Sequence, residues 1–331
     1  MKATFFTAPE YLGNRQFAES DPCLNRDGCL SPFIALRGEL AQAGISLDTQ
    51  DITPASDARF AIYNDMPPRR AVVGSRKYLL LLESEVIRPD NWDLSRHAYF
   101  DAVFTWRDDL VDGKRYVKIN FTADLSAPPP DERPRGRFCA VIAGNKSARH
   151  PLELYSKRIE AVRWFEKHHP GELDLYGPNW DKQPSLKDYV KFAVGKGPFP
   201  RRRAPFTSYR GTAADKTATL RNYRFSICFE NARDIPGYIT EKILECFHAG
   251  CVPVYWGAPN IADHIPEAAF IDFRRFNSYE SLYRHLSAMS PETYAAHQAA
   301  AREFLSSPRA DPFRPEHFAR TILDRILSDV G

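Results

Sequence analysis

The feature that most constrains the fold is a proline-rich segment near the middle of the chain, "TADLSAPPPDERPRGR" (Thr122–Arg137). Three consecutive prolines cannot continue a helix or a central strand, because proline has a fixed φ and lacks a backbone N–H. The segment therefore predicts a linker, which we place at residues 126–137. It separates an N-terminal domain, 1–125, from a C-terminal domain, 138–315. A last helix, 316–331, follows, and whether it packs back on the first domain is left open.

Short apolar runs alternate with helical patterns on both sides of this linker. In the N-terminal part the runs are "RAVVG", "KYLLLLES" and "YFDAVFTW", and "SPFIALRGELAQAG" has apolar residues at helical spacing. After the linker, "FCAVIAG", "LDLYG", "RFSICFE", "CVPVYWG" and "AAFIDF" are expected strands, with helical patterns such as "ITEKILECFHAG" between them. This alternation is typical of parallel sheets covered on both faces. We therefore predict an α/β chain with two doubly wound, Rossmann-like domains facing each other across a cleft.

Composition excludes several classes of protein. A net charge of +3 and the lack of a recognition motif argue against nucleic-acid binding. No run approaches the roughly 20 apolar residues of a membrane span, and the first residues lack the apolar core of a signal peptide. We expect a cytoplasmic protein. The basic cluster "PRRRAP" (Pro200–Pro205) is interpreted either as a solvated loop or as a peripheral contact with a membrane or glycolipid.

Polar residues directly follow three of the expected strands. Because ligands of open parallel sheets bind outside the carboxyl ends of the strands, three places are of interest: "FEN" (Phe229–Asn231), "AGNK" (Ala143–Lys146) and "LES" (Leu82–Ser84). Asn145 is a candidate binding residue on this ground.

A lysine stands near the start of the helix predicted after "FEN". Pro236 and Gly237 mark a loop, and the helical pattern begins near residues 238–240. A helix N-terminus offers free N–H groups and a positive dipole end, so it suits a phosphate group. Lys242 is mildly unfavourable there on its own, by about 0.3–1 kcal/mol, and favourable beside a diphosphate. The residues alone leave open whether Lys242 is solvated and pairs with Glu241 or Glu245.

The segment "FSICFENARDIPGYITEKILECFHAGCVPVYWGAPNI" resembles the signature of the α-1,3-fucosyltransferase family, glycosyltransferase family 10, in its bacterial form. The shared features are a Phe-Glu-Asn strand end, a Tyr-x-Thr-Glu-Lys helix start, and a Val-Pro-Val strand that ends in glycine. The resemblance implies a GT-B fold, with the acceptor bound by the first domain and GDP-fucose by the second. It also implies inversion at the anomeric carbon of fucose.

The resemblance assigns roles to residues of this signature. Lys242 matches the lysine that neutralises the diphosphate, and Glu241 matches the glutamate that binds the ribose. Tyr238 and Asn231 match contacts to the nucleotide sugar, and Glu230 lies in the same strand-end motif.

A second cation for the diphosphate is implied on the helix after the first strand of the second domain. Arg158, in "LYSKRIEAVRWF", is preferred, and Arg149, earlier in the loop, is the alternative. No two aspartates are spaced as Asp-x-Asp, the metal motif of GT-A enzymes. We therefore expect no tightly bound metal, while stimulation by a divalent ion stays open.

The reaction also needs a base, because a sugar hydroxyl loses its proton as it attacks, and a carboxylate can accept it. Glu83 ends an apolar strand, and the resemblance matches it to the proposed catalytic glutamate of the family. Glu85 is its rival, because the spacing to the following proline varies among relatives. The alternative for Glu83 is an ordinary ion pair with Arg88 or Lys77.

These expectations define an inverting transfer of fucose from GDP-fucose to a GlcNAc- or galactose-containing surface glycan, such as lipopolysaccharide, in α-1,3/1,4 linkage. A retaining GT-B enzyme would carry a glutamate eight residues before Glu245, where this chain has Gly237. Two alternatives remain, namely a different GDP-sugar donor and a non-catalytic binding homologue.

Overall fold

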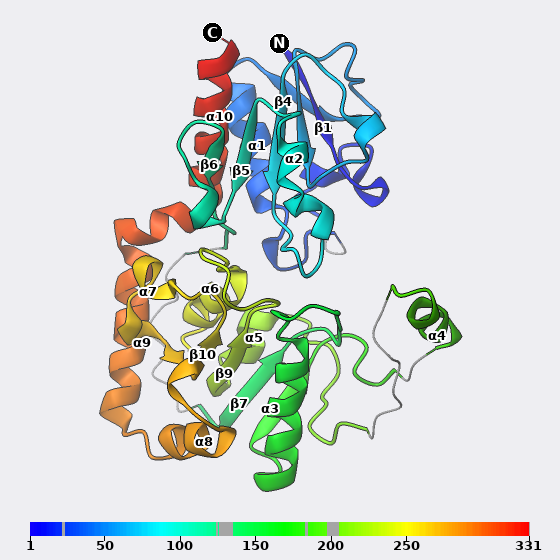
Figure 1. Ribbon diagram of the computed structural model, residues 1–331. Coiled ribbons are helices and arrows are strands. Elements are labelled where there is room, and N and C mark those ends of the chain that lie inside the picture. Colours follow the sequence, from blue (N-terminus) through cyan, green and yellow to red (C-terminus); the bar gives the residue numbers. More distant parts are fainter. Residues whose placement is uncertain (22–23, 124, 126–134, 183–184, 197–204, 331) are drawn as a thin grey trace. The chain divides into compact units, whose positions relative to one another are not determined.

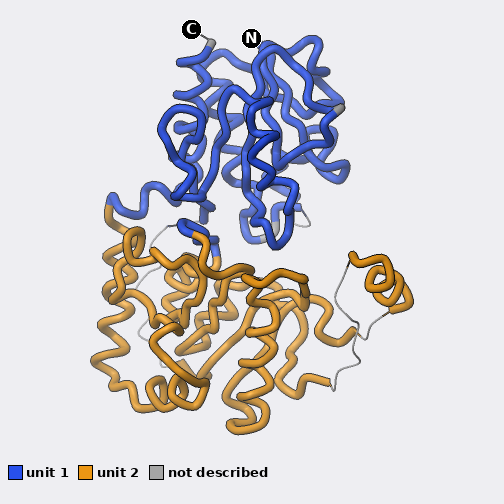
Figure 2. Tube along the Cα trace, in the orientation of Figure 1, with its two compact units in different colours: residues 1–125, 236–241, 308–331 blue, residues 126–235, 242–307 orange. Residues whose placement is uncertain are grey.

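The computed structural model describes the chain except for residues 22–23, 124, 126–134, 183–184, 197–204 and 331 (Figure 1). Most of the predicted linker and most of the basic cluster at 200–205 lie outside the described residues. The chain forms two compact units, coloured separately in Figure 2. Unit 1 comprises residues 1–125, 236–241 and 308–331, and unit 2 comprises residues 126–235 and 242–307. The expected C-terminal domain, 138–315, thus differs from unit 2 in three places: unit 2 also includes 126–137, and it lacks 236–241 and 308–315.

Unit 1 is built on a six-stranded parallel sheet with the order β2-β1-β3-β4-β5-β6. The chain adds β2 on one side of β1 and then returns to add β3 on the other side, which makes the sheet doubly wound. The strands are β1 (Lys2–Phe6), β2 (Ser46–Thr49), β3 (Phe60–Asn64), β4 (Lys77–Leu81), β5 (Ala102–Thr105) and β6 (Tyr116–Lys118). The helices are α1 (Ser31–Gln42), α2 (Leu94–His97) and α10 (Pro315–Val330).

Both faces of this sheet are buried. Along β4, Tyr78 belongs to the same core cluster as residues of α1 and α10, whereas its neighbour Leu79 belongs to a cluster on the other face. Consecutive residues of a strand point to opposite faces, so one apolar run supplies both cores. Helix α10 contributes Phe318 and Ile322 to the first cluster and lies beside α1 (Figure 1).

The sequence predicted α1, β4 and β5 of this unit and missed the other strands. The run "RAVVG" is not a strand: a 3-10 turn covers Arg69–Ala71, and the hydroxyl of Tyr63 hydrogen-bonds the backbone of Val73. The strand that fills this part of the sheet is β3, which is buried at four of its five residues.

Unit 2 is built on a five-stranded parallel sheet with the order β11-β10-β9-β7-β8. The strand order reverses between β7 and β9, so this sheet is doubly wound as well. The strands are β7 (Arg137–Ile142), β8 (Leu173–Tyr176), β9 (Tyr223–Phe229), β10 (Val252–Trp256) and β11 (Ile271–Asp272). The helices are α3 (Tyr155–His168), α4 (Leu186–Ala193), α5 (Lys216–Leu220), α6 (Glu241–His248), α7 (Ile261–His264), α8 (Tyr279–Ser287) and α9 (Pro291–Ser306). All five expected strands are present, and the predicted α/β class is confirmed.

One core cluster joins the unit 2 sheet to two of its helices. Phe165 of α3 and Leu282 of α8 lie in the same cluster as Phe225 of β9 and Val254 of β10. In the part of the chain that the structure describes, no helix is long and apolar enough to cross a membrane.

Candidate active site

The carboxyl ends of β7 and β9 mark the point where the strand order of unit 2 reverses. The two strands are paired, with Cys139 opposite Phe225 and Ala140 opposite Ser226. Glu230 and Asn231 directly follow β9, and Asn145 lies three residues after β7. The topological rule for open sheets places ligands at such a reversal. The structure therefore brings two of the three predicted strand ends, those of β7 and β9, together at the carboxyl end of the unit 2 sheet.

Arg158 reaches this edge from the first turn of α3. Its side chain is buried, with the residue only 3% exposed. Nη2 donates to the carbonyl oxygen of Phe229 at 2.7 Å and to Oδ1 of Asn231 at 2.9 Å, while Nε donates to the same carbonyl at 3.2 Å. Arginine is rarely buried to this extent. These hydrogen bonds fix a cation against the carboxyl end of β9.

The alternative arginine lies elsewhere in unit 2. Arg149 is exposed, and its guanidinium carbon lies 4.9 Å from the ring centre of Phe192 on α4. Asn145 joins two loops, because its Nδ2 donates to the carbonyl of Asn179 at 3.0 Å and its backbone N–H donates to the carbonyl of Pro178 at 3.0 Å. Of the two arginines, the structure places Arg158 with Asn231.

Lys242 lies with the buried carboxylate that ends β9. Its Nζ is 3.2 Å from Oε2 of Glu230, which has no exposed surface, whereas the Lys242 side chain is 21% exposed. Glu245, one of the two partners that the sequence left open for Lys242, is paired with Lys216 at 2.9 Å. A buried carboxylate is stable only beside a cation or strong donors. Glu230 therefore orients the Lys242 ammonium group, which still reaches solvent.

The glycine that ends β10 makes room for this pair. A Cβ atom on Gly257 would overlap Oη of Tyr255 and Cγ of Glu230. The backbone N–H of Glu230 also donates to the carbonyl of Trp256 at 2.8 Å, so the two strand ends run close together. Only glycine allows such a close approach, which gives a physical reason for the glycine in "VPVYWG".

The loop before α6 belongs to unit 1. Asp108 donates its backbone N–H to the carbonyl of Pro236 at 3.2 Å. The ring of Tyr238, only 1% exposed, lies 4.6 Å from the ring of Trp106. The predicted donor residues are thus divided at the start of α6: Tyr238 and Glu241 fall in unit 1, and Lys242 falls in unit 2.

Gly237 carries two independent constraints in this loop. Its φ is +78°, and a Cβ atom would overlap the carbonyl oxygen of Trp106 and lie 2.8 Å from the carboxylate of Asp108. Gly237→Ala is expected to lower the free energy of unfolding by about 1–3 kcal/mol, because crowding adds to the left-handed strain. Gly113→Ala is the matched control, since Gly113 has a φ of +68° and nothing within 4 Å of its Cβ position. Urea unfolding of both variants measures the difference, and equal losses would contradict the crowding argument.

Glu83 lies two residues past the end of β4 in unit 1, and its backbone is held on both sides. Its N–H donates to Oδ1 of Asp65 at 3.3 Å. Its carbonyl oxygen accepts hydrogen bonds from Nδ2 of Asn91 at 3.1 Å and from Nε1 of Trp92 at 3.1 Å. The residue is half-buried. These contacts fix the position from which the carboxylate extends.

Asp65 and Asn91 form the support of this strand end. Oδ1 of Asp65 accepts from the backbone N–H of Leu82 at 3.1 Å and from Nδ2 of Asn91 at 2.8 Å. Asn91 is fully buried, and its carbonyl oxygen lies 2.7 Å from Nε2 of His97, a histidine whose pKa is lowered by burial. Neither residue was predicted from the sequence. Asp65 directly follows β3, so the strand-end rule would have found it had β3 been recognised.

Glu85, the rival base, lies in an ion pair. Its Oε2 is 3.4 Å from Nη1 of Arg107, and both side chains are 25% exposed. Between the two glutamates, the hydroxyl of Ser84 is buried and has no hydrogen-bond partner among the described residues. A buried polar atom left in this way costs about 1–3 kcal/mol.

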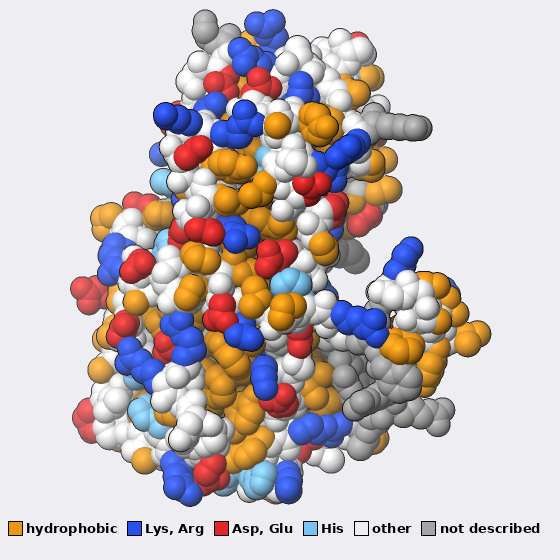
Figure 3. Space-filling view, viewed as in Figure 1, with side chains coloured by type: hydrophobic (Ala, Val, Ile, Leu, Met, Phe, Trp, Pro, Cys, Tyr) orange, Lys and Arg blue, Asp and Glu red, His pale blue; other side chains and the backbone are white. Residues whose placement is uncertain are grey.

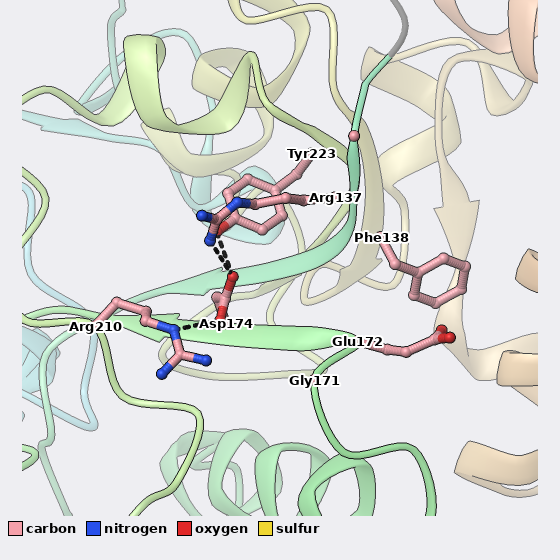
Figure 4. A pocket seen from close by; sticks show the side chains of 8 residues that line it. Arg137, Phe138, Gly171, Glu172, Asp174, Arg210 and Tyr223 are labelled. Carbon is pink, nitrogen blue, oxygen red and sulfur yellow. Dashed lines mark hydrogen bonds and ion pairs between the residues drawn. The ribbon is translucent and has the colours of Figure 1, made fainter.

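A pocket of about 390 Å³ lies at the opposite end of the unit 2 strands, where their amino ends lie (Figure 4). It is lined by the amino ends of β7, β8 and β9, whereas Glu230 and Asn231 follow the carboxyl end of β9. Both oxygens of the buried Asp174 carboxylate are occupied, by Nη1 of Arg137 at 2.6 Å, by Nε of Arg210 at 2.7 Å and by the hydroxyl of Tyr223 at 2.8 Å. Burial and hydrogen bonding raise the pKa of Tyr223. The charges of this pocket satisfy one another, so it has the character of a structural ion cluster.

Metal-binding side chains do not gather in the described residues. No three His, Cys, Asp or Glu residues among them lie close enough together to hold a metal ion. The positive groups of the candidate site are side chains, Arg158 and Lys242.

Two Rossmann-like α/β units define the GT-B class of glycosyltransferase folds. The crystal structure of an alpha1,3-fucosyltransferase with GDP-fucose superposes on the chain with a TM-score of 0.53 at 14% identity, covering 98% of this chain and 89% of that one. At this identity the likeness shows the fold. Residues 148–302, a little under half of the chain, match the family model described as glycosyltransferase family 10 (fucosyltransferase), C-terminal part.

Two curated relatives match the same region. Alpha-(1,3)-fucosyltransferase FucT of Helicobacter pylori is 27% identical over 150 residues, which cover 39% of this chain and 31% of that protein. Alpha-(1,4)-fucosyltransferase of Arabidopsis thaliana is 31% identical over 85 residues, which cover 25% of this chain and 21% of that protein. The matched regions thus span less than a third of the length of either relative.

Proposed function

We propose that the protein is an inverting fucosyltransferase that moves fucose from GDP-fucose to a hydroxyl of a GlcNAc- or galactose-containing surface glycan, in α-1,3/1,4 linkage. The observation that carries the proposal is the pair of cations at the carboxyl end of β9, where Arg158 is fixed on Asn231 and Lys242 is oriented by Glu230. All four residues lie within 148–302, the part that matches the family model.

In this proposal unit 2 binds the donor. The bond between fucose and GDP breaks with its electrons going to the diphosphate, which gains negative charge. Lys242 and Arg158 meet that charge with groups already held in place by Glu230, Phe229 and Asn231. Preorganised charges of this kind are usually the largest contribution of a site to rate.

Unit 1 supplies the base in this proposal. The acceptor oxygen attacks the anomeric carbon as GDP leaves, and its proton passes to the carboxylate of Glu83. A single displacement of this kind inverts the configuration at that carbon. The support of Glu83 by Asp65, Asn91 and Trp92 fits a carboxylate that must be positioned accurately for proton transfer.

The test is GDP release and glycan formation by the purified full chain. GDP-fucose, GDP-mannose and UDP-glucose are each offered with an array of galactosyl and N-acetylglucosaminyl acceptors. We expect GDP release only with GDP-fucose, and only with an acceptor that becomes fucosylated, as mass spectrometry of the product shows. Turnover with GDP-mannose alone would assign a different donor. Tight GDP binding without turnover on any acceptor would favour a non-catalytic binding protein.

A further inference from the structure

Helix α4 exposes an unusual number of apolar side chains. Leu186 is 80% exposed, Tyr189 42% and Val190 55%, and Val194, directly after the helix, is 59% exposed. Among the described residues, these four are over a third of the eleven exposed large hydrophobic side chains, and they lie within nine residues. Spacings of three and four residues place them on one side of a helix, which we call the α4 apolar face. Figure 3 shows orange, hydrophobic side chains gathered on α4 at the right of the view.

Helix α4 is stabilised by its own capping residues, and it contacts the rest of unit 2 through Phe192. Ser185 and Asp188 form a capping box, with the Ser185 backbone N–H 2.8 Å from the Asp188 carboxylate. Phe192, which contacts Arg149, lies about 200° around the helix from Val190 at ~100° per residue. The four side chains of the α4 apolar face stay exposed beside this contact.

Positive charge accompanies this face. Lys187 and Lys191 each follow an apolar residue of the face by one position, so they border it, and Lys196 comes soon after. In the sequence, residues 182–203 contain seven Lys or Arg and one acidic residue, a net charge of +6. Since the whole chain carries +3, the other 309 residues together carry −3. In the sequence, the basic charge is therefore concentrated in the segment that includes α4.

We propose that α4 binds the surface of a membrane rich in anionic phospholipids. The α4 apolar face enters the boundary between headgroups and acyl chains, and the flanking lysines lie against lipid phosphates. A short helix with an apolar side and lysines at its border has the properties of an interfacial helix. Each Lys or Arg near an anionic surface contributes about 1 kcal/mol of binding. This inference is independent of the proposed donor and base residues.

Charge also decides between occupants of the face. A second copy of the chain would bring the Lys187 and Lys191 side chains of both copies together, and like charges at short range oppose that contact. An anionic lipid surface offers an apolar phase for the exposed valine and leucine side chains. It offers negative charge for the lysines at the same place.

The test is co-sedimentation of the full chain with vesicles. Vesicles of phosphatidylcholine alone are compared with vesicles of phosphatidylcholine and phosphatidylglycerol. Both are tested at low salt and in 0.5 M NaCl, which shortens the electrostatic screening length to roughly 4 Å. Wild type is expected to bind only the anionic vesicles and to dissociate in high salt. Leu186→Ser/Val190→Ser and Lys187→Glu/Lys191→Glu are each expected to weaken binding at least about tenfold, since each loses more than 1.4 kcal/mol.

Matched controls separate this face from general surface changes. Leu94→Ser removes an exposed leucine of α2, 48% exposed, and Lys167→Glu reverses an exposed lysine of α3. Both are expected to bind like wild type. Failure of wild type to bind anionic vesicles, or equal binding to neutral ones, would overturn the proposal. So would light scattering that shows the α4 variants breaking a dimer. GDP release with a soluble acceptor should be unchanged in all four variants, so a failure here is distinct from a failure of the proposed enzyme activity.

Discussion

Replacing Lys242 by methionine is expected to lower kcat/KM for GDP-fucose about 100-fold or more and to weaken GDP binding. The substitution removes a cation from the place where the proposed leaving group gains negative charge, and loss of one preorganised donor typically costs about 10²–10³ in rate. Steady-state kinetics with GDP-fucose and calorimetry with GDP measure the two effects. Lys242→Arg, which keeps the charge, is expected to keep part of the activity.

Lys242 also contacts Glu230, so its replacement is expected to affect stability as well as activity. A second substitution at Glu230 separates the two effects. Lys242 donates a charge-assisted hydrogen bond to a carboxylate without exposed surface, so its loss also lowers stability, by about 2 kcal/mol. The double variant Lys242→Met/Glu230→Gln removes both charges and is expected to regain stability but not activity. If the double variant regained wild-type turnover, the lysine would serve only to neutralise Glu230, and the donor proposal would fail.

Replacing Glu83 by glutamine is expected to lower kcat by about 10²–10⁴-fold with little change in GDP affinity. Glutamine has nearly the same shape but cannot accept the proton of the acceptor hydroxyl, and general-base catalysis contributes about that much. Because the variant keeps the three hydrogen bonds to the Glu83 backbone, it is expected to fold like wild type. Kinetics with a saturating acceptor, beside calorimetric titration with GDP, separates the two quantities.

Glu85→Gln is the matched control for this experiment. It removes a neighbouring carboxylate whose ion pair with Arg107 is partly exposed and contributes about 0–1 kcal/mol. Near-normal turnover is expected. A large loss in Glu85→Gln together with normal turnover in Glu83→Gln would reverse the assignment of the base.

The C-terminal half of the fold was predictable because its strands are compact apolar runs bounded by glycine or polar residues. "RFSICFE" and "CVPVYWG" correspond to β9 and β10 within one or two residues. In unit 1 the same rule failed for β2, whose four residues include Ser46 and Asp48, and for β6, whose residues are all half-buried. Local composition does not identify strands whose burial is decided by helices distant in the sequence.

The candidate site was predictable in its residue types and not in its partners. The lysine near a helix start indicated an anion site, but the sequence offered only Glu241 or Glu245 as its partner, and the structure pairs it with Glu230. The contact between Lys242 and Glu230 joins residues twelve positions apart on two different elements, so it could be known only from the fold. Asn91 gave no local signal at all, because its role depends on reaching both Asp65 and the carbonyl of Glu83.

The way the chain passes between its units has a consequence for how it is synthesised. Unit 1 takes its residues from the beginning, the middle and the end of the sequence, and its core contains Phe318 and Ile322 of the last helix. Until those residues leave the ribosome, one face of its sheet has no cover. Unit 2 lies wholly between residues 126 and 307. The second unit of the sequence is therefore the first that can complete its core during translation, and the N-terminal unit must wait for the C-terminus.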